Sequence, residues 1–78
     1  MNCEVLNKLQ ALLITFANER GISLHAEFGT VENFKTFVVA FAIKSLVDAG
    51  LEIAKAYDFI LGNGEYDKLV EATWNAAQ

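Results

Sequence analysis

The sequence predicts an all-α protein: a compact four-helix orthogonal bundle with a central hydrophobic helix and an extended crossover over residues 22–29. Three observations favour this class. Apolar residues recur three and four positions apart in four segments, which is the spacing of one helix face. Glycines separate the segments, and no proline interrupts them. The chain has 78 residues, the length of one small domain, so residues 1–78 are expected to form a single helical domain.

The first helix is predicted over residues 4–20. Its apolar residues follow one face: Val5, Leu9, Leu12, Leu13 and Phe16. Asn2 is a candidate N-cap, because its side-chain oxygen can accept a hydrogen bond from a free N–H group of the first turn. Gly21 follows Arg20 and ends the helix, since glycine readily adopts the left-handed conformation found after many helices.

Residues 22–29 form the ambiguous segment. Apolar side chains alternate with polar ones, which is the period of a strand: Ile22, Leu24, Ala26 and Phe28. A lone strand leaves its backbone unpaired, so the first interpretation is an apolar loop that covers the bundle. The alternatives are an extended segment paired with another chain, and one short helical turn capped by Ser23.

The central helix is predicted over residues 31–49, with Thr30 as its N-cap. Its residues are apolar on most sides, as in a helix that other helices surround. Phe37, Val39 and Phe41 also alternate like a strand, but the length of the apolar pattern favours a helix. Gly50 ends it.

A third helix is predicted over residues 51–61, with Ile53, Tyr57 and Ile60 on its inner face and Phe59 off that face. The Gly-Asn-Gly sequence at 62–64 then breaks the helix.

The fourth helix is predicted over residues 65–77, with Asn63 as a candidate N-cap. Its apolar stripe is the clearest in the chain: Tyr66, Leu69, Val70, Thr73, Trp74 and Ala77. A helix of this length is marginally stable alone in water, so the stripe is expected to dock on the other helices with Trp74 as a core residue.

Composition points to a partner. Six basic residues stand against ten acidic ones, for a net charge of −4, and no basic cluster is present to neutralise phosphates. Binding of nucleic acid through a helix-turn-helix therefore ranks third, after binding of a protein partner and self-association. The hydrophobic fraction is 54%, above the ~45–50% of typical domains. We expect some of this apolar surface to be covered by another chain.

Catalytic and metal-binding motifs are missing from the sequence. The single histidine, His25, has no nucleophile and orienting acid at a spacing that would imply a triad. One cysteine, Cys3, and one histidine exclude a zinc site made of these residues. The acidic turn from Asn63 to Asp67 lacks the twelve-residue frame of a calcium loop. No enzyme activity, metal or cofactor is expected.

The leading functional hypothesis is therefore a small, acidic, non-enzymatic module that binds a protein partner and assembles with it or blocks it. Size and the lack of catalytic motifs suit an accessory or inhibitor role in a phage or mobile element. The alternative is a self-associating homodimer. The longest apolar run, Phe37–Ile43, is too short to span a bilayer, so a cytoplasmic protein is expected. The predicted partner-binding residues are Phe28, Asp58, Phe59, Glu65, Asp67 and Glu71.

Overall fold

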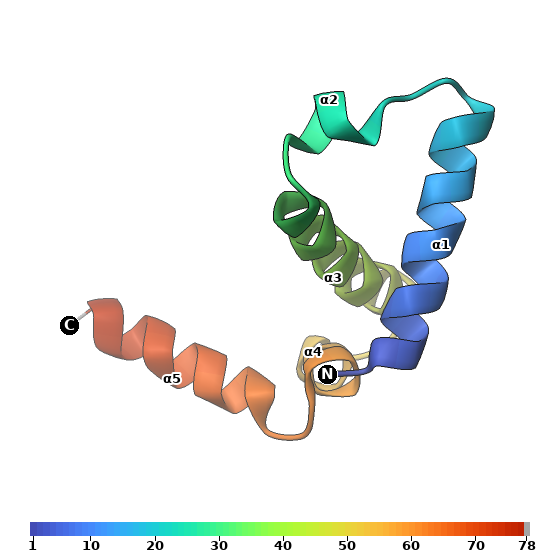
Figure 1. Cartoon of the computed structure of the whole chain (residues 1–78). Helices are drawn as coiled ribbons and strands as arrows, with labels where there is room; N and C mark the ends of the chain where they lie inside the picture. The colour runs from blue at the N-terminus through green and yellow to red at the C-terminus, as the bar shows by residue number, and fades with distance from the viewer. Residues whose placement is uncertain (78) are drawn as a thin grey trace.

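The computed structural model describes residues 1–77 and is all-α over that range, as the sequence predicts. The described residues form five helices where the sequence pattern predicted four: α1 (Cys3–Glu19), α2 (Leu24–Phe28), α3 (Val31–Asp48), α4 (Ile53–Leu61) and α5 (Glu65–Ala77). In Figure 1, α1 and α3 diverge from a shared lower end, α2 bridges their upper ends, and α4 lies across the lower end. α5 projects away from these four helices.

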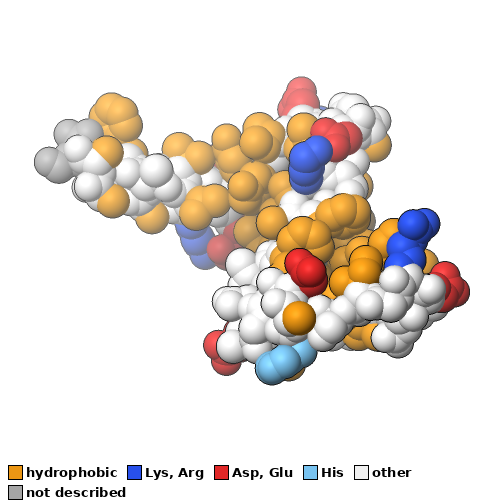
Figure 2. Space-filling model, turned by 90° about the horizontal axis from the view of Figure 1, so that it is seen from above, with side chains coloured by type: hydrophobic (Ala, Val, Ile, Leu, Met, Phe, Trp, Pro, Cys, Tyr) orange, Lys and Arg blue, Asp and Glu red, His pale blue; other side chains and the backbone are white. Residues whose placement is uncertain are grey.

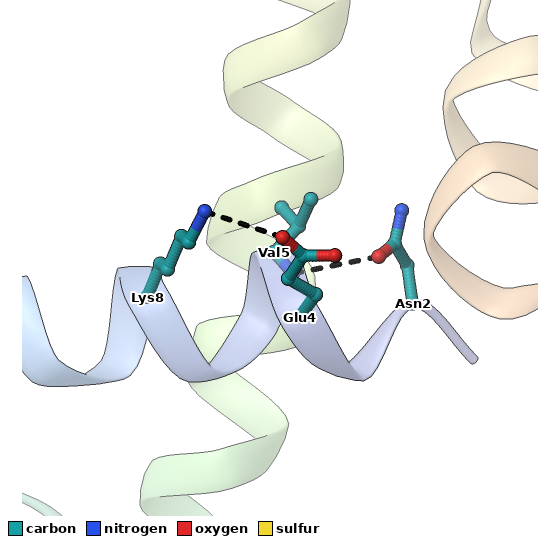
Figure 3. Close-up of polar contacts among 4 residues, drawn as sticks. All are labelled: Asn2, Glu4, Val5 and Lys8. Carbon is teal, nitrogen blue, oxygen red and sulfur yellow. Dashed lines mark hydrogen bonds and ion pairs between the residues drawn. The ribbon is translucent and has the colours of Figure 1, made fainter.

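The N-terminus of α1 is fixed as the sequence predicts. The Asn2 side chain accepts a hydrogen bond from the Val5 N–H group at 3.4 Å (Figure 3). One turn further on, Lys8 pairs with Glu4 at 3.3 Å, but both side chains are exposed, so the pair adds little stability. The Asn2 N–H group also donates to the Ile60 carbonyl at 2.7 Å. This bond ties the start of the chain to α4.

The prediction of an extended crossover over residues 22–29 is wrong, because the segment contains the short helix α2, which is the alternative of a helical turn capped by Ser23. The Ser23 hydroxyl accepts a hydrogen bond from the Ala26 N–H group at 3.2 Å, and Gly29, with φ of 81°, ends the helix. The segment has no neighbouring strand, so helical hydrogen bonds satisfy its backbone locally. Leu24 and Phe28, four residues apart, then share a face and are both packed against the core.

The third helix, α3, is the central helix, as predicted, and it packs against α1, α2 and α4. Its buried side chains follow one broad face: Phe34, Val38, Ala42 and Ile43. Thr30 caps its start, accepting a hydrogen bond from the Asn33 N–H group at 3.1 Å. Gly50 follows its end with φ of 107°, and the Leu51 N–H group donates back to the Leu46 carbonyl at 3.0 Å. This is the glycine-based termination that the sequence predicts.

The fourth helix, α4, closes the core. Ala56 and Ile60 are fully buried and join a cluster with Leu6 of α1 and the buried residues of α3. Ile53, predicted on the inner face, is instead half exposed, whereas Ala56 takes the inner position. The helix begins only at Ile53, and there Ile53 lines an open surface pocket together with Ile43 and Val47 of α3. Its inner face is set by Ala56 and Ile60, which are four residues apart.

The junction between α4 and α5 is held by a side-chain hydrogen bond and by a contact between two rings. Asp58 of α4 accepts a hydrogen bond from the Tyr66 N–H group at 3.0 Å, so Asp58, and not the predicted Asn63, fills the capping role at the start of α5. The rings of Tyr57 and Tyr66 lie 5.3 Å apart. Gly62 and Gly64 both have positive φ, which lets the chain turn sharply between the two helices.

Beyond that junction, α5 projects from the other four helices, and we call it the arm (Figure 1). The prediction that its apolar stripe docks on the other helices is therefore wrong. α5 has no buried residue, and Trp74 is 66% exposed instead of lying in the core. The Cα radius of gyration is 14.4 Å, against about 11.5 Å expected for a compact chain of this length. The fold is therefore a four-helix body with a projecting helix.

Candidate interaction surfaces

One face of the arm carries an uncovered apolar stripe. We call it the arm stripe, and its residues are Leu69, Val70, Thr73, Trp74 and Ala77. Leu69, Val70 and Trp74 are 45%, 48% and 66% exposed. Figure 2 shows hydrophobic side chains along the projecting arm as well as over the body. Water contacts a continuous row of large apolar side chains on one helix face, which is the pattern of a helix that docks in a groove.

The body carries a concave apolar surface at the opposite end from the junction. We call this hollow the aromatic groove, and it has a volume of about 380 Å³. It lies between the C-terminal half of α1, α2 and the start of α3. Its lining is apolar except for Glu27, and comprises Leu13, Phe16, Ala17, Ile22, Leu24, Glu27, Phe28, Phe34 and Phe37.

Aromatic rings shape the floor and the rim of this groove. Phe28 contacts Phe34 and Phe37 with ring centroids 5.4 Å and 5.0 Å apart, and Phe37 continues to Phe41 at 5.8 Å. These separations suit tilted ring pairs, which add to burial. Phe16 stands on the α1 side, half exposed, with the Arg20 guanidinium 4.4 Å from its ring centroid. Rings that pack on one another therefore form part of the lining of the groove.

The structure distributes the predicted partner-binding residues over four places: the groove, the exposed side of α4, the junction between α4 and α5, and the arm. Phe28 lines the aromatic groove, while Phe59 is 52% exposed on α4 and lines neither surface. Asp58 is engaged with the Tyr66 N–H group, and Glu65 pairs with Lys68 at 3.3 Å.

Of these residues, Glu65, Asp67 and Glu71 lie beside the arm stripe, with Glu65 on its Leu69 side. Asp67 and Glu71 are exposed and lie one turn apart on α5. At 100° per residue, both fall on the side of the stripe that Trp74 occupies. An acidic edge therefore follows the most exposed apolar residue of the arm.

Sequence reasoning missed the residues that dominate both surfaces. Trp74, Leu69 and Phe16 were all placed on helix faces expected to pack on other helices, because helical spacing identifies an apolar face but not what covers it. The sequence does indicate that some apolar side chains stay exposed to water, because so short a chain has an excess of apolar residues. The Gly-Asn-Gly break before an amphipathic helix marks which helix can separate from the rest.

Polar chemistry plays a small part in these surfaces. Cys3 and His25 are both exposed, on separate helices. Residues 1–77 contain no group of three His, Cys, Asp or Glu side chains placed to hold a metal ion. Among the same residues, no helix is long and apolar enough to cross a membrane. Both the arm stripe and the aromatic groove are lined mainly by apolar side chains, and carboxylates lie at their edges.

Comparison of the chain with protein-family models, with curated proteins and with solved structures gave no match.

Proposed function

We propose that this protein is a non-enzymatic interaction module that binds another polypeptide chain through the arm stripe, and so assembles with that chain or blocks its other contacts. The observation that carries the proposal is Trp74, the sole tryptophan, standing 66% exposed on a helix that its own fold leaves uncovered. Tryptophan is among the residues most enriched at the energetic centres of interfaces.

The energetics favour binding over exposure. Covering a large apolar side chain contributes about 1.5–3 kcal/mol, and the arm presents three such side chains in one row: Leu69, Val70 and Trp74. A partner also stabilises α5, because a helix of 13 residues with only its first turn packed is marginal in water. Asp67 and Glu71 place two carboxylates beside the stripe, so the charge of the partner's surface affects how tightly it binds. An accessory or inhibitory role of the kind found in phages and mobile elements fits such a module.

The test is capture of protein partners by paired arm variants of the whole chain. Trp74→Asp places a carboxylate on the stripe, and Asn75→Asp places the same carboxylate on the opposite face of α5. Wild type and Asn75→Asp should retain the same polypeptide from cells that produce the protein, and Trp74→Asp should lose it. A second copy of the chain, carrying a different tag, counts as such a polypeptide. Equal retention by both variants, with circular dichroism showing both folded, would contradict the proposal.

A further inference from the structure

The structure presents a convex apolar helix and a concave apolar groove in one chain. From this pairing we infer that α5 of one copy docks in the aromatic groove of a second copy and receives that copy's α5 in return, which makes a two-fold symmetric homodimer. This inference rests on the proposed function and names its partner.

The groove has room for the side chains that the arm stripe would insert. Its volume is about 380 Å³, whereas a dry apolar cavity of roughly 150 Å³ is enough to bind benzene. The indole of Trp74 and a neighbouring aliphatic side chain such as Val70 can therefore enter together. Phe16 and Phe37 are half exposed at the groove and would meet the indole with ring edges and faces.

The exposed area supports a partner of the size of one copy. The chain exposes 5815 Å² of surface, whereas a folded monomer of 8.6 kDa exposes about 4,700 Å². The difference of about 1,100 Å² exceeds the ~800 Å² that each partner contributes to a stable interface of standard size. The excess belongs to the whole elongated chain, and the exposed side chains of the arm stripe and the groove contribute to it.

The placement of the two surfaces favours exchange between copies. α5 leaves the body at the junction with α4 and projects to one side, while the groove lies at the other end of the body (Figure 1). In the proposed dimer, a two-fold axis places each arm in the groove of the other copy. Such an exchange closes at two chains and leaves no stripe free to recruit a third.

The first test uses the full chain without substitution. Sedimentation velocity between about 1 and 300 µM should show the mass rise from 8.6 kDa to twice that value. The emission of Trp74 should shift to shorter wavelength over the same concentrations and lose its sensitivity to iodide. Because the chain has a single tryptophan, this emission reports on the arm alone.

The second test assigns the two surfaces. Leu69→Asp on the arm and Phe16→Asp in the groove should each raise the dimer dissociation constant at least about 30-fold, the effect of losing an interface hot spot. Asn75→Asp and Phe59→Asp are the matched controls, because they add the same charge at positions outside both surfaces: Asn75 lies on the opposite face of α5, and Phe59 is an exposed aromatic of α4. Mixing the Leu69→Asp and Phe16→Asp proteins should restore a heterodimer, since one intact arm can enter one intact groove.

Three results would overturn the inference. The first is a chain that stays monomeric over the whole concentration range. The second is a monomer whose tryptophan is already protected, which would mean that the arm folds back on its own body. The third is normal dimerisation of Phe16→Asp alongside loss in Leu69→Asp, which would place the arms against each other. A monomer that still captures another protein through Trp74 rejects only this inference, whereas a chain that neither self-associates nor captures rejects the proposed function as well.

Discussion

Two residues of similar apolar character have opposite roles in this chain. Ile60 is fully buried between α1, α3 and α4, and Trp74 is two-thirds exposed on the arm. Stability depends on the area that folding removes from water, so the larger side chain contributes less here. Burial, and not residue type, therefore decides which substitution unfolds the body.

We expect Ile60→Ala to lower the free energy of unfolding by about 2–5 kcal/mol, because it leaves a cavity in the core. Trp74→Ala should change it by no more than about 0.5 kcal/mol, the usual range for exposed positions. Urea denaturation followed by circular dichroism, at a concentration where the chain is monomeric, measures both values. A loss of several kcal/mol in Trp74→Ala would mean that the arm stripe is buried within its own chain.

At the scale of elements, each helix is as stable as the contacts its neighbours make with it. The core cluster contains residues of α1, α3 and α4, and side chains of α2 pack against it. No residue of α5 belongs to the cluster or to its surrounding layer. The body is therefore expected to fold without the arm.

A chain that ends after Gly62 should keep the helices of the body and unfold cooperatively, with a midpoint within a few degrees of that of the full chain. The expectation follows because the truncation removes no core residue. Circular dichroism during heating checks it. A truncated chain that is unfolded at 25 °C would show that α5 supports the body in a way these contacts do not explain.

Asp58→Ala should loosen α5 alone. Its carboxylate accepts the hydrogen bond from the Tyr66 N–H group, and the loss of such a cap costs about 0.5–2 kcal/mol. Amide hydrogen exchange should become several-fold faster in residues 66–77 and stay unchanged in α3. Faster exchange throughout the body would show that Asp58 acts on global stability.

Sequence reasoning recovers the helices more completely than their packing. Asn2, Thr30 and Gly50 fix helix ends by hydrogen bonds within a few residues, so α1 and α3 are predictable from local pattern. α2 was harder, because its alternating apolar residues also fit a strand and Ser23 decides between the two. The exposure of α5 depends on Asp58 and on the direction of the chain after Gly62, which no periodicity encodes.

At the scale of the whole molecule, charge opposes the association that the apolar surfaces favour. Each copy carries a net charge of −4, and the arm brings Asp67 and Glu71 into the proposed interface. Like charges within about 10 Å repel, and salt screens that repulsion. The balance between apolar burial and repulsion should therefore vary with ionic strength.

Raising sodium chloride from about 20 mM to 500 mM should strengthen the proposed dimer several-fold, because the Debye length falls well below the separation of most charges on the two copies. Sedimentation equilibrium at each salt concentration gives the dissociation constant. A dimer that weakens with salt would indicate that ion pairs, and not apolar contacts, hold the two copies together.

The position of the lone indole has a practical consequence for anyone who studies how this chain unfolds. Its fluorophore sits on the arm, remote from the cluster around Ile60. A melting curve recorded by indole emission would trace the fraying or release of α5, and ellipticity would trace the loss of the body. The two curves need not coincide, and their mismatch would mimic a folding intermediate in a body that unfolds in one step.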